Sequence, residues 1–283
     1  MLIRTLPLPT PPTIPTEPLT PSSFAPFGSV LTNPVPELHP SAAASSSSPS
    51  LLPQGYGAVS ANQGTAIQYR GLAPPLRDLY AQAPSGRRAS PRTTMFVCGA
   101  RELEPEGKGG EEESAGRGSK SGSRGLFAVQ VLERHPFTTQ TFVPLSSSSS
   151  SLSPASVQYL VIVAPTLPPS SADKDFPVPE EEAAKAGSQQ KLPGRGMPDL
   201  SRIRAFLATG SQAVTYGAGT WHAPMAALGP PGSAIEFVVV QFANDEPVED
   251  CQEVALEGGK GDGGPRIKVR VEGQRRGDGS SKL

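Results

Sequence analysis

The sequence has few histidines, few aromatic residues and no long hydrophobic run. Its 283 residues include 3 His, 1 Trp and 2 Cys, and aromatic residues make up 6%. The longest apolar run, 159–164, has the length of a strand, whereas a membrane-spanning helix needs roughly 20 apolar residues. Cys98 and Cys251 lie far apart without the spacing of a metal site, so we expect reduced thiols inside the cell. No membrane partner is expected.

An excess of charge of either sign is also lacking, with 25 Lys and Arg against 26 Asp and Glu. Because phosphate binding needs a basic face, this balance argues against a nucleic-acid partner. The first twelve residues contain one Arg and several prolines, which is typical of neither a secretory signal nor a transit peptide.

Proline, glycine and serine are abundant, with 33 Pro, 30 Gly and several serine runs. Such segments gain too little from burial to offset the entropy lost on ordering. The segments of this composition are 38–53, 103–125, 146–156, 168–197 and the region from 258 onward. We therefore predict a flexible N-terminus over 1–18, one compact domain over 19–257 interrupted by long disordered insertions, and a flexible tail over 258–283.

Between these insertions the pattern favours short strands. In 126–135 polar and apolar residues alternate, which places Glu133 and His135 on one face. Further strands are predicted over 140–145, 157–165, 212–216 and 234–242. One short helix is predicted over 198–210, because Asp199 suits an N-cap and Gly210 a helix end. This composition predicts an all-β barrel or sandwich.

Two compact stretches hold two of the three histidines. In the first, Glu133 and His135 point into the predicted barrel and Gln140 begins the next strand. Buried groups of this kind must be paired, hydrogen-bonded or metal-bound, so the stretch fits either a structural polar network or a reactive site. In the second, "GAGTWHAPM", a glycine-rich turn precedes Trp221 and His222. Trp221 fits an ordinary core residue as well as a site residue, and His222 fits a capped turn residue as well as a site residue.

The two stretches resemble degenerate versions of the motifs that build the interior site of cupin barrels. Beyond this, the chain resembles the ureidoglycolate lyase family, and its fungal branch in particular. The blocks that carry the resemblance are "LTPSSFAPFGSVL", "ANQGTAIQY", "LERHPFTTQTFVP", "YLVIVAP", "PDLSRIRAFLATGSQAVTYGAGTWHAPM" and "DCQE". The resemblance implies a cupin-like β-barrel, usually a homodimer, that cleaves (S)-ureidoglycolate to glyoxylate and urea in allantoin (purine) catabolism.

Cleavage of this substrate needs a base, an acid for the leaving nitrogen, and a cation or amide donors for the carboxylate. The candidate catalytic residues are His135, His222 and Glu133, because histidine titrates in the useful range and a carboxylate can fix its tautomer. The candidate substrate-binding residues are Asn62, Gln63, Gln140 and Trp221. The resemblance also implies a divalent metal, nickel in some members, whose ligands would be His135, His222, Glu133 and Gln140; a metal-free site is the alternative.

The chain departs from the family pattern at Gln68 and Val97, where related chains tend to carry a basic residue. One cation expected for the substrate carboxylate is then either missing or supplied by Arg70, Arg92 or Arg101. Three other functions fit the sequence: a different metal-dependent cupin enzyme acting on a small acid, a non-catalytic cupin binding module, and an amidohydrolase that releases ammonia from ureidoglycolate.

The sequence ends in Ser281-Lys282-Leu283, the tripeptide read by the peroxisomal import receptor. A polar, glycine-rich stretch precedes it. We expect a peroxisomal protein, with a cytoplasmic enzyme as the alternative.

Overall fold

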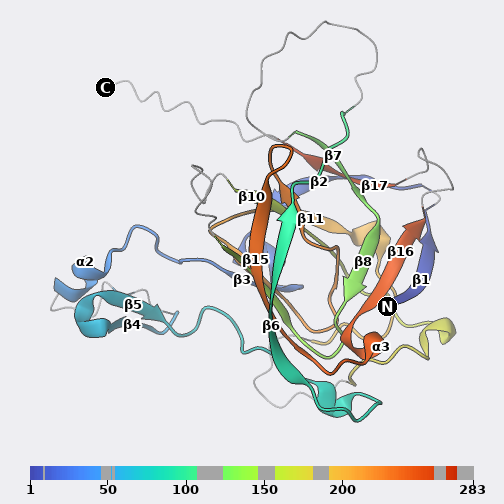
Figure 1. The fold of residues 1–283 in the computed structure, drawn as a ribbon, viewed down its shortest axis with the longest axis horizontal. Coiled ribbons are helices and arrows are strands. Elements are labelled where there is room, and N and C mark those ends of the chain that lie inside the picture. Colours follow the sequence, from blue (N-terminus) through green and yellow to red (C-terminus); the bar gives the residue numbers. More distant parts are fainter. Residues whose placement is uncertain are drawn as a thin grey trace, which may run out of the picture.

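A computed structural model describes residues 1–8, 10–45, 52, 55–106, 124–145, 157–180, 191–257 and 266–272. Strands dominate these residues and are arranged in two large sheets (Figure 1). This confirms the predicted all-β, cupin-like class. Among the described helices, none is long and apolar enough to cross a membrane.

The larger sheet curls into a half-barrel. Its strand order is β1 (Leu2–Pro7), β16 (Gln252–Glu257), β8 (Val131–Arg134), β13 (Trp221–His222), β10 (Gln158–Ala164), β11 (Arg204–Thr209), β2 (Thr13–Pro18), β17 (Ile267–Val271) and β7 (Gly125–Val129), and β14 (Ala226–Leu228) also pairs with β10. The smaller sheet has the order β3 (Gly28–Leu31), β12 (Ala213–Tyr216), β9 (Gln140–Leu145), β15 (Ala234–Ala243) and β6 (Ser90–Gly99).

Strand β10 is buried on both faces, which explains its continuous run of apolar residues. Tyr159, Val161 and Val163 pack toward the smaller sheet, against residues such as Phe142 and Phe237. The alternate side chains of β10 belong to a second core cluster, in which the ends of the curled sheet meet. The space between the two sheets is thus the barrel interior.

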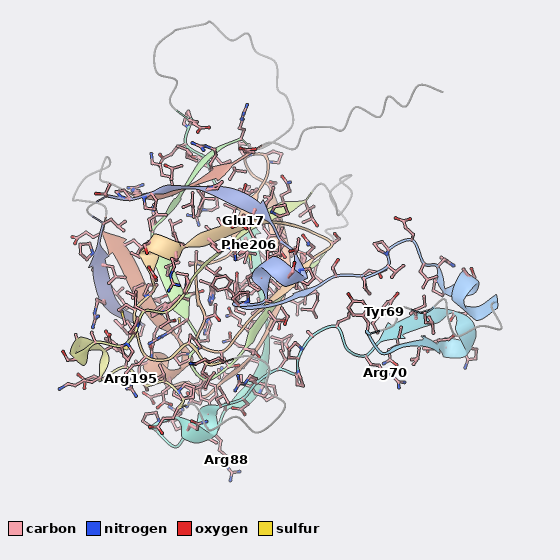
Figure 2. All side chains as sticks on the ribbon, turned by 180° about the vertical axis from the view of Figure 1, so that it is seen from behind. Glu17, Tyr69, Arg70, Arg88, Arg195 and Phe206 are labelled. Atoms are coloured by element: carbon pink, nitrogen blue, oxygen red, sulfur yellow. The ribbon has the colours of Figure 1, made fainter. Side chains whose placement is uncertain are left out.

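A separate arm extends from this body. It consists of α2 (Pro40–Ser45) and the hairpin of β4 (Ala58–Ala61) and β5 (Ala66–Tyr69), joined by a short 3-10 turn at Asn62–Gly64. Figure 1 shows these elements to one side of the barrel, and Figure 2 shows Tyr69 and Arg70 on the same arm.

The helix predicted over 198–210 is wrong. Asp199 does cap a turn, since its carboxylate accepts a hydrogen bond from the Ser201 backbone, but this turn is a single 3-10 turn, Leu200–Arg202. The following residues form β11, which is hydrogen-bonded to β10 on one side and to β2 on the other. Burial of both faces of β11, with Ala205 in one cluster and Phe206 in the other, overrides the helical spacing.

The predicted flexible ends also contain strands. Residues 1–18 form β1 and β2, which pair in parallel with β16 and β17. Strand β17 lies within the predicted tail, where the alternation of Ile267, Val269 and Val271 buries one face. The remaining helices are short: α1 (Pro21–Phe24), α3 (Pro247–Asp250) and the 3-10 turns Tyr80–Gln82 and Ser171–Asp173.

The predicted insertions fall into two groups, those outside the described residues and those that belong to the ordered body. Residues 46–51, 53–54, 107–123, 146–156, 181–190 and 258–265 lie outside the described residues, as does Ser281-Lys282-Leu283. Parts of 168–197, by contrast, belong to the ordered body. Asp173 is 2% exposed and binds Arg4, and the backbone carbonyls of Gly194, Arg195 and Gly196 accept hydrogen bonds from buried Arg134.

Candidate active site

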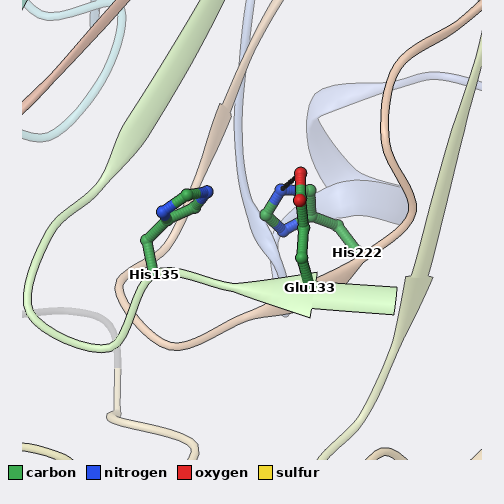
Figure 3. Close-up of side chains that lie close together, drawn as sticks. All are labelled: Glu133, His135 and His222. Carbon is green, nitrogen blue, oxygen red and sulfur yellow. Dashed lines mark ion pairs between the residues drawn. The ribbon is translucent and has the colours of Figure 1, made fainter. Parts of the chain in front are cut away.

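Glu133, His135 and His222 converge at one end of the barrel interior (Figure 3). Glu133 lies on β8, directly opposite His222 on β13, and His135 follows the end of β8. The His222 Nε2 atom is 3.5 Å from a carboxylate oxygen of Glu133, and the two imidazole centroids are 5.6 Å apart. One ligand atom from each of the three residues lies within 4.8 Å of the others. The structure thus brings together the three predicted catalytic residues.

Backbone carbonyls fix the tautomers of both histidines. His135 Nδ1 donates to the carbonyl of Asp250 at 2.6 Å, and His222 Nδ1 donates to that of Thr220 at 3.0 Å. Each neutral ring therefore carries its lone pair on Nε2, and both buried Nε2 atoms have no hydrogen-bond partner among the described residues. Two lone pairs and a carboxylate oxygen facing one another repel unless a proton or a metal ion lies between them. Such hydrogen bonds from Nδ1 to backbone carbonyls are typical of metal-binding histidines.

The electrostatics of the site also favour neutral His135 and ionised Glu133. Burial is the main cause that lowers the pKa of His135 to about 4, and the charge of His222 adds to it. Burial opposes ionisation of Glu133, but the His222 imidazole, which in its protonated form directs an N–H and a positive charge at this carboxylate, outweighs burial, so the pKa of this carboxyl is lowered. His135 is therefore an unprotonated imidazole at neutral pH, the form that accepts a proton or binds a metal.

The glycine-rich turn before β13 connects the two histidines. Gly219 has a φ of +78°, and its backbone N–H donates to the carbonyl of His135 at 2.8 Å. A Cβ atom at this position would lie 3.1 Å from the ring of Pro193. Glycine is thus required here both by backbone conformation and by space, and the turn sets the position of His135 as well as that of His222.

A hydrogen-bond network holds the carbonyl that orients His135. The carboxylate of Asp250 in α3 accepts from the Tyr80 hydroxyl at 2.7 Å and from the backbone N–H groups of Asn244 and Asp245 at 2.9 Å each. The Asp250 backbone is thereby fixed, and with it the acceptor of His135 Nδ1. Neither Tyr80 nor Asp250 was singled out by the sequence, because the contact joins segments 115 residues apart.

The smaller sheet contributes the opposite wall of the site. Tyr216 on β12 stacks on His222, with ring centroids 4.0 Å apart and an interplanar angle of 13°. Gln140 is its register partner on β9, and Gln140 Nε2 donates to Gln241 Oε1 at 2.7 Å. Burial raises the pKa of Tyr216 well above its usual value, so its hydroxyl stays protonated. Tyr216 and Gln241 were missed; period-two alternation of 212–216 and 234–242 could have placed them beside Gln140.

The comparisons with known proteins give the family of this chain. Residues 11–260 match the ureidoglycolate lyase family. The chain belongs to this family. It is 30% identical over 239 residues to ureidoglycolate lyase of Schizosaccharomyces pombe, covering 84% of this chain and 89% of the relative.

Two further members of the ureidoglycolate lyase family show similar likeness. The Saccharomyces cerevisiae ureidoglycolate lyase is 39% identical over 129 residues, which cover 44% of this chain and 49% of the relative. Ureidoglycolate lyase of Burkholderia mallei is 28% identical over 233 residues, or 82% of this chain and 84% of the relative. The family match spans both stretches in which the histidines were found.

The structure does not bring Trp221, a predicted substrate-binding residue, together with Glu133, His135 and His222. Adjacent residues of a strand point to opposite faces, so Trp221 enters the core cluster behind His222. Its ring is fully buried, its Nε1 donates to the Gly196 carbonyl, and the Arg134 guanidinium stacks on it with 4.4 Å to the centroid. We interpret Trp221 as a core residue rather than a substrate ligand.

Asn62 and Gln63 are not at the site either. They form the exposed 3-10 turn at the end of the hairpin on the arm (Figure 1), and both have positive φ. The candidate cations are also dispersed: Arg70 lies on the arm, Arg101 stacks over Phe127, and Arg92 is paired with Asp245 at 2.6 Å. Among the three, Arg92 is the one linked to the site by register, as the cross-strand partner of Gln241.

A cavity of about 490 Å³ lies elsewhere, between β2, β10 and β11. Its lining includes two carboxylates, Glu17, which is paired with Arg204 at 2.6 Å, and Glu272, but no histidine. This cavity therefore lacks the acid–base groups that converge at Glu133.

Proposed function

We propose that the protein is a ureidoglycolate lyase that cleaves (S)-ureidoglycolate to glyoxylate and urea in purine catabolism. The observation that carries the proposal is the convergence of two imidazole Nε2 atoms and the Glu133 carboxylate in the barrel interior. Membership of the ureidoglycolate lyase family supports the substrate.

The reaction needs one proton to move twice. In the metal-free site, an Nε2 lone pair accepts the proton of the substrate hydroxyl, the oxygen electrons form the carbonyl of glyoxylate, and the C–N bond breaks toward the ureido nitrogen. The imidazolium then returns the proton to that nitrogen, and urea leaves. Glu133 stabilises the transient imidazolium, because its carboxylate lies 3.5 Å from His222 Nε2. Positioned acid–base catalysis of this kind contributes about 10²–10⁴-fold.

The same three side chains fit a divalent metal ion. Two neutral imidazoles with one carboxylate are a common ligand set for first-row divalent metals, and both histidines have the carbonyl partners seen in such sites. A bound nickel or related ion would supply positive charge for the carboxylate and hydroxyl of the substrate. Gln140 is also a proposed ligand of this ion, but its place on the opposite wall favours contact with the substrate instead.

A product assay tests the proposed function. Purified protein is incubated with (S)-ureidoglycolate, with and without chelator, and glyoxylate, urea and ammonia are measured separately. We expect equal amounts of glyoxylate and urea. Ammonia without urea would indicate an amidohydrolase, and binding without turnover a cupin binding module. Oxygen consumption with a small acid would indicate another metal-dependent cupin enzyme.

We also propose a homodimer that forms through the outer face of the smaller sheet. Strand β6 is the edge of this sheet, and Met95 and Val97 on its outer face are 57% and 66% exposed. Val143 and Leu145 of β9 continue this apolar surface. A long apolar edge of this kind invites pairing unless it is covered, and a second copy would cover it.

Light scattering during gel filtration measures the solution mass. We expect twice the mass of the chain for the wild type and the single mass for Val97→Lys. A monomeric wild type would contradict the dimer.

We further propose peroxisomal import, supported by Ser281-Lys282-Leu283 alone. A fluorescent protein fused at the N-terminus leaves this tripeptide free. Punctate fluorescence should become diffuse when the three residues are removed. A signal that is diffuse from the start would instead support the cytoplasmic alternative.

A further inference from the structure

We propose that Tyr216 and Gln140 form the subsite that binds the ureido group of the substrate. In this subsite the Tyr216 hydroxyl donates to the ureido carbonyl, and Gln140 Oε1 accepts from a ureido N–H. The inference rests on the proposed function and specifies which residues select its substrate.

The two side chains lie side by side on the wall opposite Glu133. They are register partners on β12 and β9, where neighbouring strands are about 4.8 Å apart. Tyr216 is 2% exposed and Gln140 is 5% exposed. The Tyr216 hydroxyl and Gln140 Oε1 are both buried without a hydrogen-bond partner among the described residues. Leaving such groups unpaired costs about 1–3 kcal/mol each, which favours a polar ligand between the sheets.

Gln241 sets the orientation of the Gln140 amide. Because Gln241 Oε1 accepts from Gln140 Nε2, the free atom of Gln140 is its oxygen. The wall therefore presents one donor, the tyrosine hydroxyl, and one acceptor, the amide oxygen. A terminal carbamoyl group has the complementary pair, because its carbonyl oxygen and one N–H lie on the same edge.

The stacking of Tyr216 on His222 connects this subsite to the reaction. With its ring centroid 4.0 Å from the imidazole, Tyr216 would hold the ureido end of the substrate beside His222. The carbon that carries the hydroxyl and carboxylate is then directed toward Glu133 and His135. This arrangement places the C–N bond that breaks next to the imidazole that moves the proton.

Two small acids separate the ureido contact from the rest of the site. N-carbamoylglycine has the ureido and carboxylate groups of the substrate but no hydroxyl, so it cannot be cleaved. Glycolate has the hydroxyl and carboxylate but no ureido group. Their dissociation constants are measured by calorimetry on the protein as purified, with its metal content determined, for the wild type and for Tyr216→Phe and Gln140→Met.

We expect each variant to bind N-carbamoylglycine about 5- to 100-fold more weakly, the range for a lost buried hydrogen bond, and glycolate within twofold of wild type. Tyr159→Phe is the matched control. Tyr159 is equally buried in the same core, but its hydroxyl donates to the Gln212 carbonyl, so this variant should bind both acids as the wild type does.

If the variants bind both acids more weakly by the same factor, the wall only maintains the structure. If their dissociation constants are unchanged, the polar atoms of the wall contact water alone. Either result overturns the inference. So does a wild type that does not bind N-carbamoylglycine. The product assay keeps the proposed function separate. A wild type that releases no urea refutes the lyase whatever the acids show, whereas an active wild type with unchanged KM and kcat in Tyr216→Phe refutes only the subsite.

Discussion

The barrel interior and the arm contain predicted site residues in opposite settings. In the interior, His135 and His222 are 8% and 1% exposed, and hydrogen bonds to backbone carbonyls fix both rings. On the arm, Asn62 and Gln63 are exposed on a turn of a two-stranded hairpin. His135 was predicted from strand periodicity as well as resemblance, and His222 from its glycine-rich turn and resemblance, whereas the arm residues came from the resemblance alone. We therefore expect mutations of the buried interior residues to have larger effects than mutations of the exposed arm residues.

Replacing the converging interior residues should give the largest loss. His222→Gln and Glu133→Gln should each lower kcat/KM for ureidoglycolate by about 10²–10⁴-fold, because both remove part of the acid–base machinery. Glyoxylate release measures the effect. His39→Gln, which changes an exposed histidine bonded to Ser41, is the control and should retain activity. Near-normal turnover in both interior variants would place the reaction elsewhere in the molecule.

The burial of His135 should make stability depend on pH. The unfolded chain binds a proton on this ring near pH 6.5, but the folded protein does so only near pH 4. As pH falls between these values the unfolded state is increasingly favoured, so the free energy of unfolding should decrease by up to about 3 kcal/mol. Urea titrations with chelator at pH 7, 5.5 and 4 measure this. His135→Gln should show a shallower pH dependence; an identical one would exclude His135 as the cause.

Gly219→Ala should have an intermediate effect. The left-handed backbone at φ +78° and the 3.1 Å approach to Pro193 both disfavour a Cβ atom, so we expect about 1–3 kcal/mol less stability. Activity should fall further than stability explains, because the Gly219 N–H also binds the His135 carbonyl. Thermal unfolding and turnover are compared with Gly232→Ala, another positive-φ glycine at which a Cβ meets open space. Equal turnover by Gly219→Ala and Gly232→Ala would show that the Gly219 turn does not position the catalytic residues.

Asn62→Ala and Gln63→Ala should have the smallest effect, less than threefold on KM. Their side chains are exposed on the arm, so neither contributes to the interior site within one chain. A tenfold rise in KM would show that the arm reaches an active site, and the comparison between the two regions would then no longer hold.

The strand pattern of the barrel and the shared face of Glu133 and His135 could be predicted because period-two alternation is a local signal, and the glycine-rich turn with its motif resemblance pointed to His222. The predicted strands 140–145, 157–165, 212–216 and 234–242 correspond to β9, β10, β12 and β15 with shifts of at most one residue. The stretch 126–135 is divided into β7 and β8 at Gln130. The alternation also placed Glu133 and His135 on one face.

Features that depend on distant partners could not be predicted. The spacing in 204–209 fits a helix, and only hydrogen bonding to β10 and β2 makes this segment a strand. Arg134 reads as a surface residue, yet it is fully buried, because Gln252 and the carbonyls of 194–196 satisfy its guanidinium and Trp221 stacks on it. No local pattern gives these long-range contacts.

The pairing of the first strand with one of the last has a consequence for how the chain folds. Leu2 of edge strand β1 is in register with Glu253 of β16, and β2 pairs with β17 inside the large sheet, so both pairs form only between segments about 250 residues apart. On the ribosome, β1 has no neighbour until nearly the whole chain has emerged, while apolar β10 is made about a hundred residues earlier. Such non-local topology slows folding and prolongs the exposure of unpaired strands. The nascent protein is thus a candidate client for chaperones that hold aggregation-prone chains until synthesis is complete.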